Sequence, residues 1–126
     1  MTIFNRDAAE PFTTADGSTI REFLNAGNSA LRNQSLAEAT LVPGQATTEH
    51  YHLQAEEIYF ITSGRGLIRI EGEVRAVEVG DAIAIPPGQA HKIWNEGEQD
   101  LVFLCCCAPA YCHEDTILTE EHSGAL

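Results

Sequence analysis

Basic residues are scarce in this chain, and acidic residues dominate its charge. The 126 residues include 19 aspartates and glutamates against seven lysines and arginines, which gives a formal net charge of -12. Lys92 is the only lysine. Such a surface repels a phosphate backbone, because affinity for nucleic acids depends on neutralising phosphate charge with cations. We therefore expect no nucleic acid and no anionic membrane surface as a partner.

Long apolar runs and a disulfide pattern are also missing. No uninterrupted apolar stretch approaches the roughly 20 residues that span a bilayer, and residues 1–12 lack the basic start and apolar run of a signal peptide. Three of the four cysteines, Cys105, Cys106 and Cys107, are consecutive, which is a poor arrangement for a disulfide framework. These features predict a soluble, cytoplasmic protein with reduced thiols.

Convincing helical periodicity is absent, whereas short apolar runs recur at regular spacing. The runs are EEIYFITSG, GLIRIEG, VRAVEVG, AIAIPPG, AHKIWNEG and DLVFLCCCAP. Each run is closed by glycine, proline or a charged turn, which is typical of an antiparallel sandwich or barrel. A chain of this length forms one domain with a single core. Residues 101–107 carry apolar side chains on both alternating faces, so the outer one must be covered by the N-terminal strands of the chain or by a second subunit, and we expect a homodimer.

Two histidines at alternate positions are the strongest sign of chemistry. His50 and His52 lie two residues apart, so on a strand they share a face and are separated by about 6.6 Å along it. Glu57 opens the following strand, and a tight turn at residues 86–88 places His91 on another. Three imidazoles and one carboxylate suit a divalent first-row metal, and an octahedral ion bound this way keeps open positions for chemistry.

Simpler interpretations compete with this metal site. An isolated pair of histidines is more often a surface or hydrogen-bonded pair. Glu56 is an alternative carboxylate, but it falls on the opposite strand face from Glu57 and is better interpreted as a solvated charge or a charge at the rim of a dimer interface.

The cysteines offer a second possible metal site. Cys105 and Cys107 share a strand face, and Cys112 and His113 follow in the sequence. The spacing contains no CxxC pair, and cysteine is often a buried apolar filler, so the core-filler interpretation is preferred. The roles of Cys106, Cys112 and His113 stay open, and the last two are placed in a C-terminal loop.

Two stretches of fixed spacing together resemble the cupin family. The first motif, G(x)5HxH(x)4E(x)6G, and the second, G(x)5PxG(x)2H(x)3N, are matched at all ten positions. The matching residues are Gly44, His50, His52, Glu57 and Gly64, then Gly80, Pro86, Gly88, His91 and Asn95. The four glycines fall at turns where a positive φ or a close backbone approach is expected.

The resemblance implies an all-β fold, the double-stranded β-helix or jelly-roll barrel of a small single-domain cupin. It implies one cupin domain over residues 1–126, with an irregular lead-in at 1–18, a conserved barrel core at 36–108 and a C-terminal extension at 109–126. It also implies that His50, His52, Glu57 and His91 bind one divalent transition metal: iron, manganese, nickel, zinc, cobalt or copper.

Three functions are compatible with such a site. The first is a metalloenzyme of the dioxygenase, isomerase or decarboxylase type, in which the metal holds a small oxygenated substrate inside the barrel. The second is a non-catalytic module that binds a sugar or another small molecule, and the third, ranked last, is a structural metal site. Tyr59 shares the face of Glu57 and is the candidate catalytic residue, although aromatic core packing explains it equally well.

Overall fold

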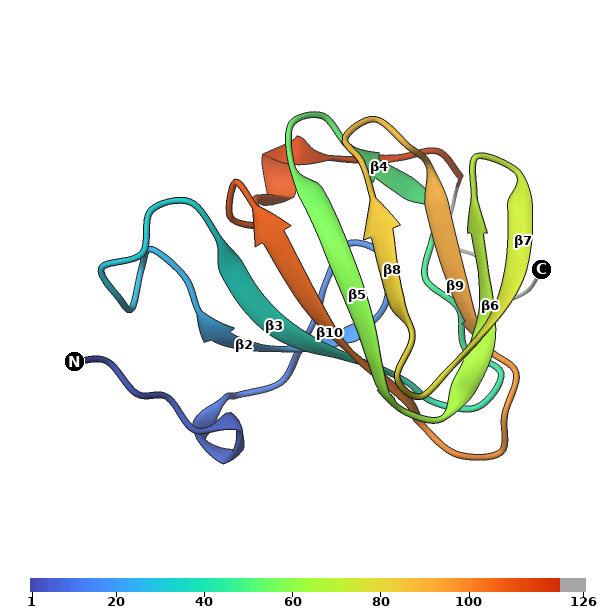
Figure 1. Cartoon of the computed structure of the whole chain (residues 1–126), viewed down its shortest axis with the longest axis horizontal. Helices are drawn as coiled ribbons and strands as arrows, with labels where there is room; N and C mark the ends of the chain where they lie inside the picture. Colours follow the sequence, from blue (N-terminus) through green and yellow to red (C-terminus); the bar gives the residue numbers. More distant parts are fainter. Residues whose placement is uncertain (121–126) are drawn as a thin grey trace.

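Strands make up about half of the residues and nearly all of the regular structure in this computed structural model, which describes residues 1–120 (Figure 1). The last six residues of the expected C-terminal extension, 121–126, lie outside the described residues. The strands are β1 (Phe12–Thr13), β2 (Thr19–Leu24), β3 (Ser35–Leu41), β4 (His50–His52), β5 (Glu56–Ser63), β6 (Arg65–Ile70), β7 (Glu73–Glu78), β8 (Ala82–Ile85), β9 (His91–Asn95), β10 (Leu101–Ala108) and β11 (Thr116–Leu118). Two single-turn 3-10 helices are added, η1 (Arg6–Ala8) and η2 (His113–Asp115). Residues 1–120 contain no helix that could span a membrane.

The strands form two antiparallel sheets. The larger sheet has the order β1-β2-β3-β10-β5-β8, and the smaller has the order β11-β4-β9-β6-β7. Neighbours in each sheet are mostly distant in sequence, since β10 pairs with both β3 and β5, and β9 pairs with both β4 and β6. Figure 1 shows β3, β10, β5 and β8 following one another across the larger sheet in the order in which they pair. The all-β jelly-roll barrel predicted from the sequence is confirmed.

The core lies between the two sheets and is built from alternate residues of their strands. Along β5 the burial alternates strictly from Glu56 to Thr62, with every second side chain buried. The buried cluster comprises Ala39, Leu41, Tyr59, Ile61, Ile68, Val77, Ile85, Ile93, Leu101 and Phe103. Because side chains on a strand alternate between faces, the same register that buries this cluster also directs Glu57 inwards.

The turns close as the glycine positions predict. Gly44, Gly64, Gly80 and Gly88 all have positive φ, at 83°, 79°, 94° and 80°. At Gly64 an added Cβ would lie 2.5 Å from the carbonyl oxygen of Asp100, so this turn requires glycine for space as well as for its backbone angle.

Both terminal segments contribute a short strand to the edge of a sheet. The lead-in, predicted to be irregular, contains β1, which pairs with β2 at the edge of the larger sheet. The C-terminal extension contains β11, which pairs with β4 at the edge of the smaller sheet. These strands are two and three residues long, too short for a recognisable alternation. They form because an edge strand offers unpaired backbone groups to any segment that reaches it.

Candidate metal centre

Three histidines converge inside the barrel from two adjacent strands. His50 and His52 belong to β4, and His91 opens β9, where it pairs with His50 across the sheet. All three side chains are buried, with 4% or less of each residue exposed. One ring nitrogen from each lies within 4.8 Å of the other two. The structure therefore brings together the three imidazoles that the sequence analysis singled out.

Backbone carbonyls determine which ring nitrogen of His50 and His91 faces the centre. The Nδ1 atom of His50 lies 2.7 Å from the oxygen of Thr48, and that of His91 lies 2.9 Å from the oxygen of Gln89. A carbonyl only accepts, so each Nδ1 carries the hydrogen and donates it. Each Nε2 is then left with a free lone pair, the form in which a neutral imidazole binds a metal.

The environment of His50 also favours the neutral ring. Burial lowers the pKa of His50, and the neighbouring ring of His91 lowers it further, while the carboxylate of Asp16 opposes both effects in part. Metal ligation requires an unprotonated nitrogen, so this direction of shift prepares His50 to act as a ligand.

His52 is held from both sides by elements that meet at β4. Its Nδ1 atom lies 3.2 Å from the hydroxyl oxygen of Thr116 in β11, and its carbonyl accepts a hydrogen bond of 2.8 Å from the N–H of Gly88. Gly88 belongs to the turn that leads into His91. The C-terminal strand and the second motif thus fix the position of the strand that carries the first two histidines.

Glu57 reaches the same centre from β5. Its Oε1 atom lies 3.2 Å from Nε2 of His52 and 3.6 Å from Nε2 of His91, while the thiol of Cys107 donates to its Oε2 atom at 3.0 Å. Burial raises the pKa of this carboxyl, but the contacts with His52 and His91 outweigh burial and hold the pKa well below its ordinary value. Glu56 is exposed on the opposite face, as the alternation predicts.

Three atoms at this centre are buried without a hydrogen-bond partner among the described residues: Nε2 of His52, Oε1 of Glu57 and Nε2 of His91. Buried polar atoms are almost always satisfied, so three neighbouring exceptions require an explanation. A divalent cation among them would satisfy all three at once, and nitrogen and carboxylate donors suit a first-row transition metal. The residues present therefore fit the metal that the sequence analysis expects.

A cavity of about 40 Å³ extends from this centre into the larger sheet. Asp16 enters it from the segment between β1 and β2, with Oδ2 at 3.8 Å from Nε2 of His50. Its Oδ1 atom accepts from the N–H and the hydroxyl of Ser18 at 2.9 and 2.6 Å. Asp16 is not recognisable as a site residue from the sequence, where the only signal at this position is the turn-forming pair of Asp16 and Gly17.

Tyr59 and two cysteines line the same cavity. Tyr59 packs against Phe103, with ring centroids 4.6 Å apart, and burial raises its pKa well above the ordinary value, so its phenol is protonated. Burial likewise raises the pKa of Cys105 and Cys107, which disfavours thiolates here. Cys112 is exposed. The cluster of metal-ligating side chains found among residues 1–120 contains histidines and no cysteine.

The comparison with protein families assigns the chain to a family. A family model described as the cupin domain matches residues 37–107, more than half of the 126 residues, so the chain belongs to the cupin family. Among curated proteins, the uncharacterized protein MJ1618 of Methanocaldococcus jannaschii is 46% identical over 114 residues, which are 90% of this chain and 91% of that protein.

Two solved structures support the fold. A predicted oxalate decarboxylase from Thermotoga maritima superposes with a TM-score of 0.77 at 23% identity, over 86% of this chain and 99% of that one. A variant of Streptomyces PAC13 with uridine gives a TM-score of 0.81 at 14% identity, over 98% of this chain and 95% of that one. Identities this low support the shared architecture and do not transfer an activity.

Proposed function

We propose that this protein is a small-molecule metalloenzyme in which His50, His52, Glu57 and His91 bind one divalent transition metal. The proposal depends chiefly on three buried atoms that could ligate a metal and have no hydrogen-bond partner among the described residues: Nε2 of His52, Oε1 of Glu57 and Nε2 of His91. When bound, such an ion supplies Lewis-acid polarisation of an oxygenated substrate or, if it is redox-active, the capacity to use dioxygen. The reaction classes are those of dioxygenases, isomerases and decarboxylases.

The residues of this chain contribute orientation and exclusion of water. The hydrogen bonds from His50 and His91 to backbone carbonyls keep both Nε2 atoms aimed at one point. The thiol of Cys107 holds Oε2 of Glu57, which leaves Oε1 for the centre. Tyr59 and Phe103 form an aromatic part of the cavity wall beside the histidines, which would limit the access of water to a bound substrate.

Tyr59 has a narrower proposed role in this enzyme. It is 2% exposed and lines the cavity, and its ring lies edge-on to His91 at 5.9 Å between centroids. Its raised pKa keeps the phenol protonated, so Tyr59 acts as a hydrogen-bond donor to a substrate rather than as a base.

We also propose that the protein is a cytoplasmic homodimer. The outer face of the larger sheet carries Ile58, which is 50% exposed, and Phe60, which is 41% exposed, beside the half-buried Val102 and Leu104. A second copy of the chain, presenting the same face, would cover these side chains. The four free cysteines agree with a reducing compartment.

The test of the enzymatic proposal is an activity screen on protein reconstituted with iron(II), manganese(II) or zinc(II). Dioxygen uptake and product formation are followed with small diols, hydroxy ketones and keto acids. Metal-dependent turnover of one of these classes supports an enzyme and identifies the reaction type. Stoichiometric metal binding with ligand binding but no turnover under any condition would instead favour the binding module.

A further inference from the structure

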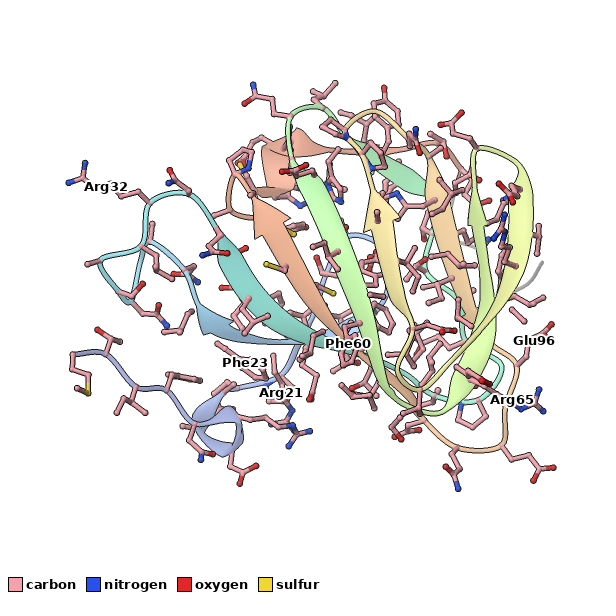
Figure 2. The ribbon with its side chains drawn as sticks, viewed as in Figure 1. Arg21, Phe23, Arg32, Phe60, Arg65 and Glu96 are labelled. Atoms are coloured by element: carbon pink, nitrogen blue, oxygen red, sulfur yellow. The ribbon has the colours of Figure 1, made fainter. Side chains whose placement is uncertain are left out.

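The seven cationic side chains of this chain all lie outside the cavity. They are Arg6, Arg21, Arg32, Arg65, Arg69, Arg75 and Lys92, and the cavity lining contains none of them. Four of them pair with acidic residues elsewhere: Arg6 with Glu38, Arg69 with Glu49, Arg75 with Glu73, and Lys92 with Glu120. Arg21 donates to the carbonyl of Ala9 at 3.1 Å. Figure 2 shows Arg32 on an outlying loop and Arg65 on the opposite side of the molecule.

Acidic side chains, in contrast, face the cavity. Asp16, Glu22 and Glu57 all line it, and Asp16 directs Oδ2 towards His50 while Ser18 occupies Oδ1. Two hydrogen bonds from Ser18 hold this carboxylate in place, so its orientation is built into the fold. Its Oδ2 atom is positioned to accept a hydrogen bond from a ligand beside the histidines.

With a divalent cation bound, the centre would have no net positive charge to attract an anionic ligand. A divalent cation brings a formal charge of +2, which the carboxylates of Glu57 and Asp16 balance. A dicarboxylate placed here would add two negative charges next to Asp16 in a poorly solvated space, where the repulsion between like charges is stronger than in water. A neutral ligand with a hydroxyl group avoids this repulsion and can donate to Asp16.

We infer that the ligand of this site is a small neutral compound bearing adjacent oxygens, such as an α-hydroxy ketone or a vicinal diol, with one hydroxyl donating to Oδ2 of Asp16. This inference rests on the proposed metal site. It separates this chain from the dicarboxylate named for the Thermotoga maritima structure, because residues 1–120 place no lysine or arginine in the cavity to receive a second carboxylate.

The remaining walls fit the same class of ligand. At one side the hydroxyls of Thr14 and Tyr111 lie 3.0 Å apart, and the backbone N–H of Tyr111 donates to the hydroxyl of Ser35 at 3.0 Å. These hydroxyl groups can donate to, or accept from, neutral oxygens. A volume of 40 Å³ has room for about three water-sized groups, so a small molecule, or one end of a larger molecule, fits beside the metal.

The experiment compares three ligands of similar size that each offer two oxygens and differ in charge: hydroxyacetone, glycolate and oxalate. Each is titrated into the cobalt(II)-loaded protein, and the visible absorption of the cobalt reports binding without any need for turnover. Cobalt content after desalting distinguishes binding from extraction of the metal. We expect hydroxyacetone to give a saturable spectral change with cobalt retained, and oxalate to give none with cobalt retained.

Asp16→Asn is the matched variant, since an asparagine side-chain oxygen can still accept from Ser18. Removal of this charge should strengthen binding of oxalate at least about tenfold and weaken binding of hydroxyacetone. Glu56→Gln removes a charge from the exposed face of β5 and should leave both affinities unchanged.

The outcomes separate this inference from the proposed function. Failure of cobalt to bind at all would overturn the metal site itself. Cobalt bound normally, with oxalate forming a stable complex in the unaltered protein, would overturn only the neutral-ligand inference. The neutral-ligand inference would also be overturned if the cobalt-loaded protein responded to none of the three ligands, or if Asp16→Asn left the preference among them unchanged.

Discussion

The two faces of β5 differ in burial and in function, although they alternate along a single strand. Glu57, Tyr59 and Ile61 point inwards and are 6%, 2% and 0% exposed. Ile58 and Phe60 point outwards and are 50% and 41% exposed. A shift of one residue in the register of this strand would exchange the two sets and turn Glu57 to solvent. The pairing with β10 and β8 on either side therefore determines both the metal centre and the surface available for association.

Replacing each of the two adjacent glutamates by glutamine should give the largest difference in metal affinity between the two faces. Glu57→Gln should weaken metal binding more than about 100-fold, because loss of residues that only support ligands already costs about 10- to 100-fold. Glu56→Gln should leave metal affinity unchanged, since its side chain is exposed on the outer face. Competition with a fluorescent chelator measures both affinities. Equal losses in the two variants would contradict the assignment of faces.

A charge on the outer face tests the proposed dimer. Phe60→Arg should weaken self-association at least about 30-fold, as expected for a central apolar residue of an interface, and leave metal affinity intact. Sedimentation velocity over a concentration series measures the association. Val79→Arg places the same charge at an exposed residue between β7 and β8 and should have no effect. A Phe60→Arg protein that stays dimeric would refute this face as the interface.

The contact between Thr116 of β11 and His52 of β4 should orient one ligand of the metal site, whereas hydroxyls on the outer face of β5 should not. Thr116→Val removes the hydroxyl that lies 3.2 Å from Nδ1 of His52 and should reduce metal affinity about tenfold. Thr62→Val makes the same change at a hydroxyl on the outer face of β5, where it donates to the carbonyl of Val102, and should not alter metal affinity. Unchanged affinity in Thr116→Val would show that β11 does not orient the ligand.

Acid should produce the smallest of these effects, by protonating Glu120 in its ion pair with Lys92. Burial raises the pKa of Glu120, but the hydrogen bond and charge of Lys92, the backbone hydrogen bond from Glu49 and the charge of Arg69 together outweigh burial and lower the pKa below its ordinary value of 4.5. A lowered pKa in the folded state means that this contribution to stability is complete above pH 4.5 and is lost as the pH falls further. The contribution is less than about 1 kcal/mol, since Glu120 is partly exposed.

Trp94, the only tryptophan, reports on this contact because its ring lies 5.4 Å from Nζ of Lys92. Its fluorescence in the metal-free protein should be constant from pH 8 to pH 5 and change below pH 4.5. Glu120→Gln should reduce this change. A transition of the same size in that variant would assign the effect to other carboxylates.

Much of the centre could be predicted because its geometry follows from strand alternation. His50 and His52 share a face whatever the rest of the chain does, and Glu56 and Glu57 are necessarily on opposite faces of β5. The turn at 86–88 places His91 opposite His50, and Gly88 adopts the positive φ that its position predicts. Local chemistry therefore determines these residues and their directions.

Asp16, Tyr111 and β11 could not be predicted, because each depends on contacts between distant segments. Asp16 is held beside His50 through a backbone hydrogen bond from Thr48, and Tyr111 through contacts with Thr14 and Ser35. No periodic pattern surrounds Asp16 or Tyr111. Strand alternation places Cys105 and Cys107 on one face, where Cys107 is buried and Cys105 partly buried, but the thiol contact between Cys107 and Glu57 depends on the pairing of β10 with β5.

Metal content tests directly whether His50, His52, Glu57 and His91 form one metal site. The protein is purified without a metal-affinity tag, incubated with a single divalent metal, desalted and subjected to elemental analysis beside His91→Ala. We expect about one metal ion per chain in the unaltered protein and a nearly complete loss in His91→Ala, with the barrel still folded by circular dichroism. Absence of metal from the unaltered protein, or equal retention in folded His91→Ala, would contradict this metal site.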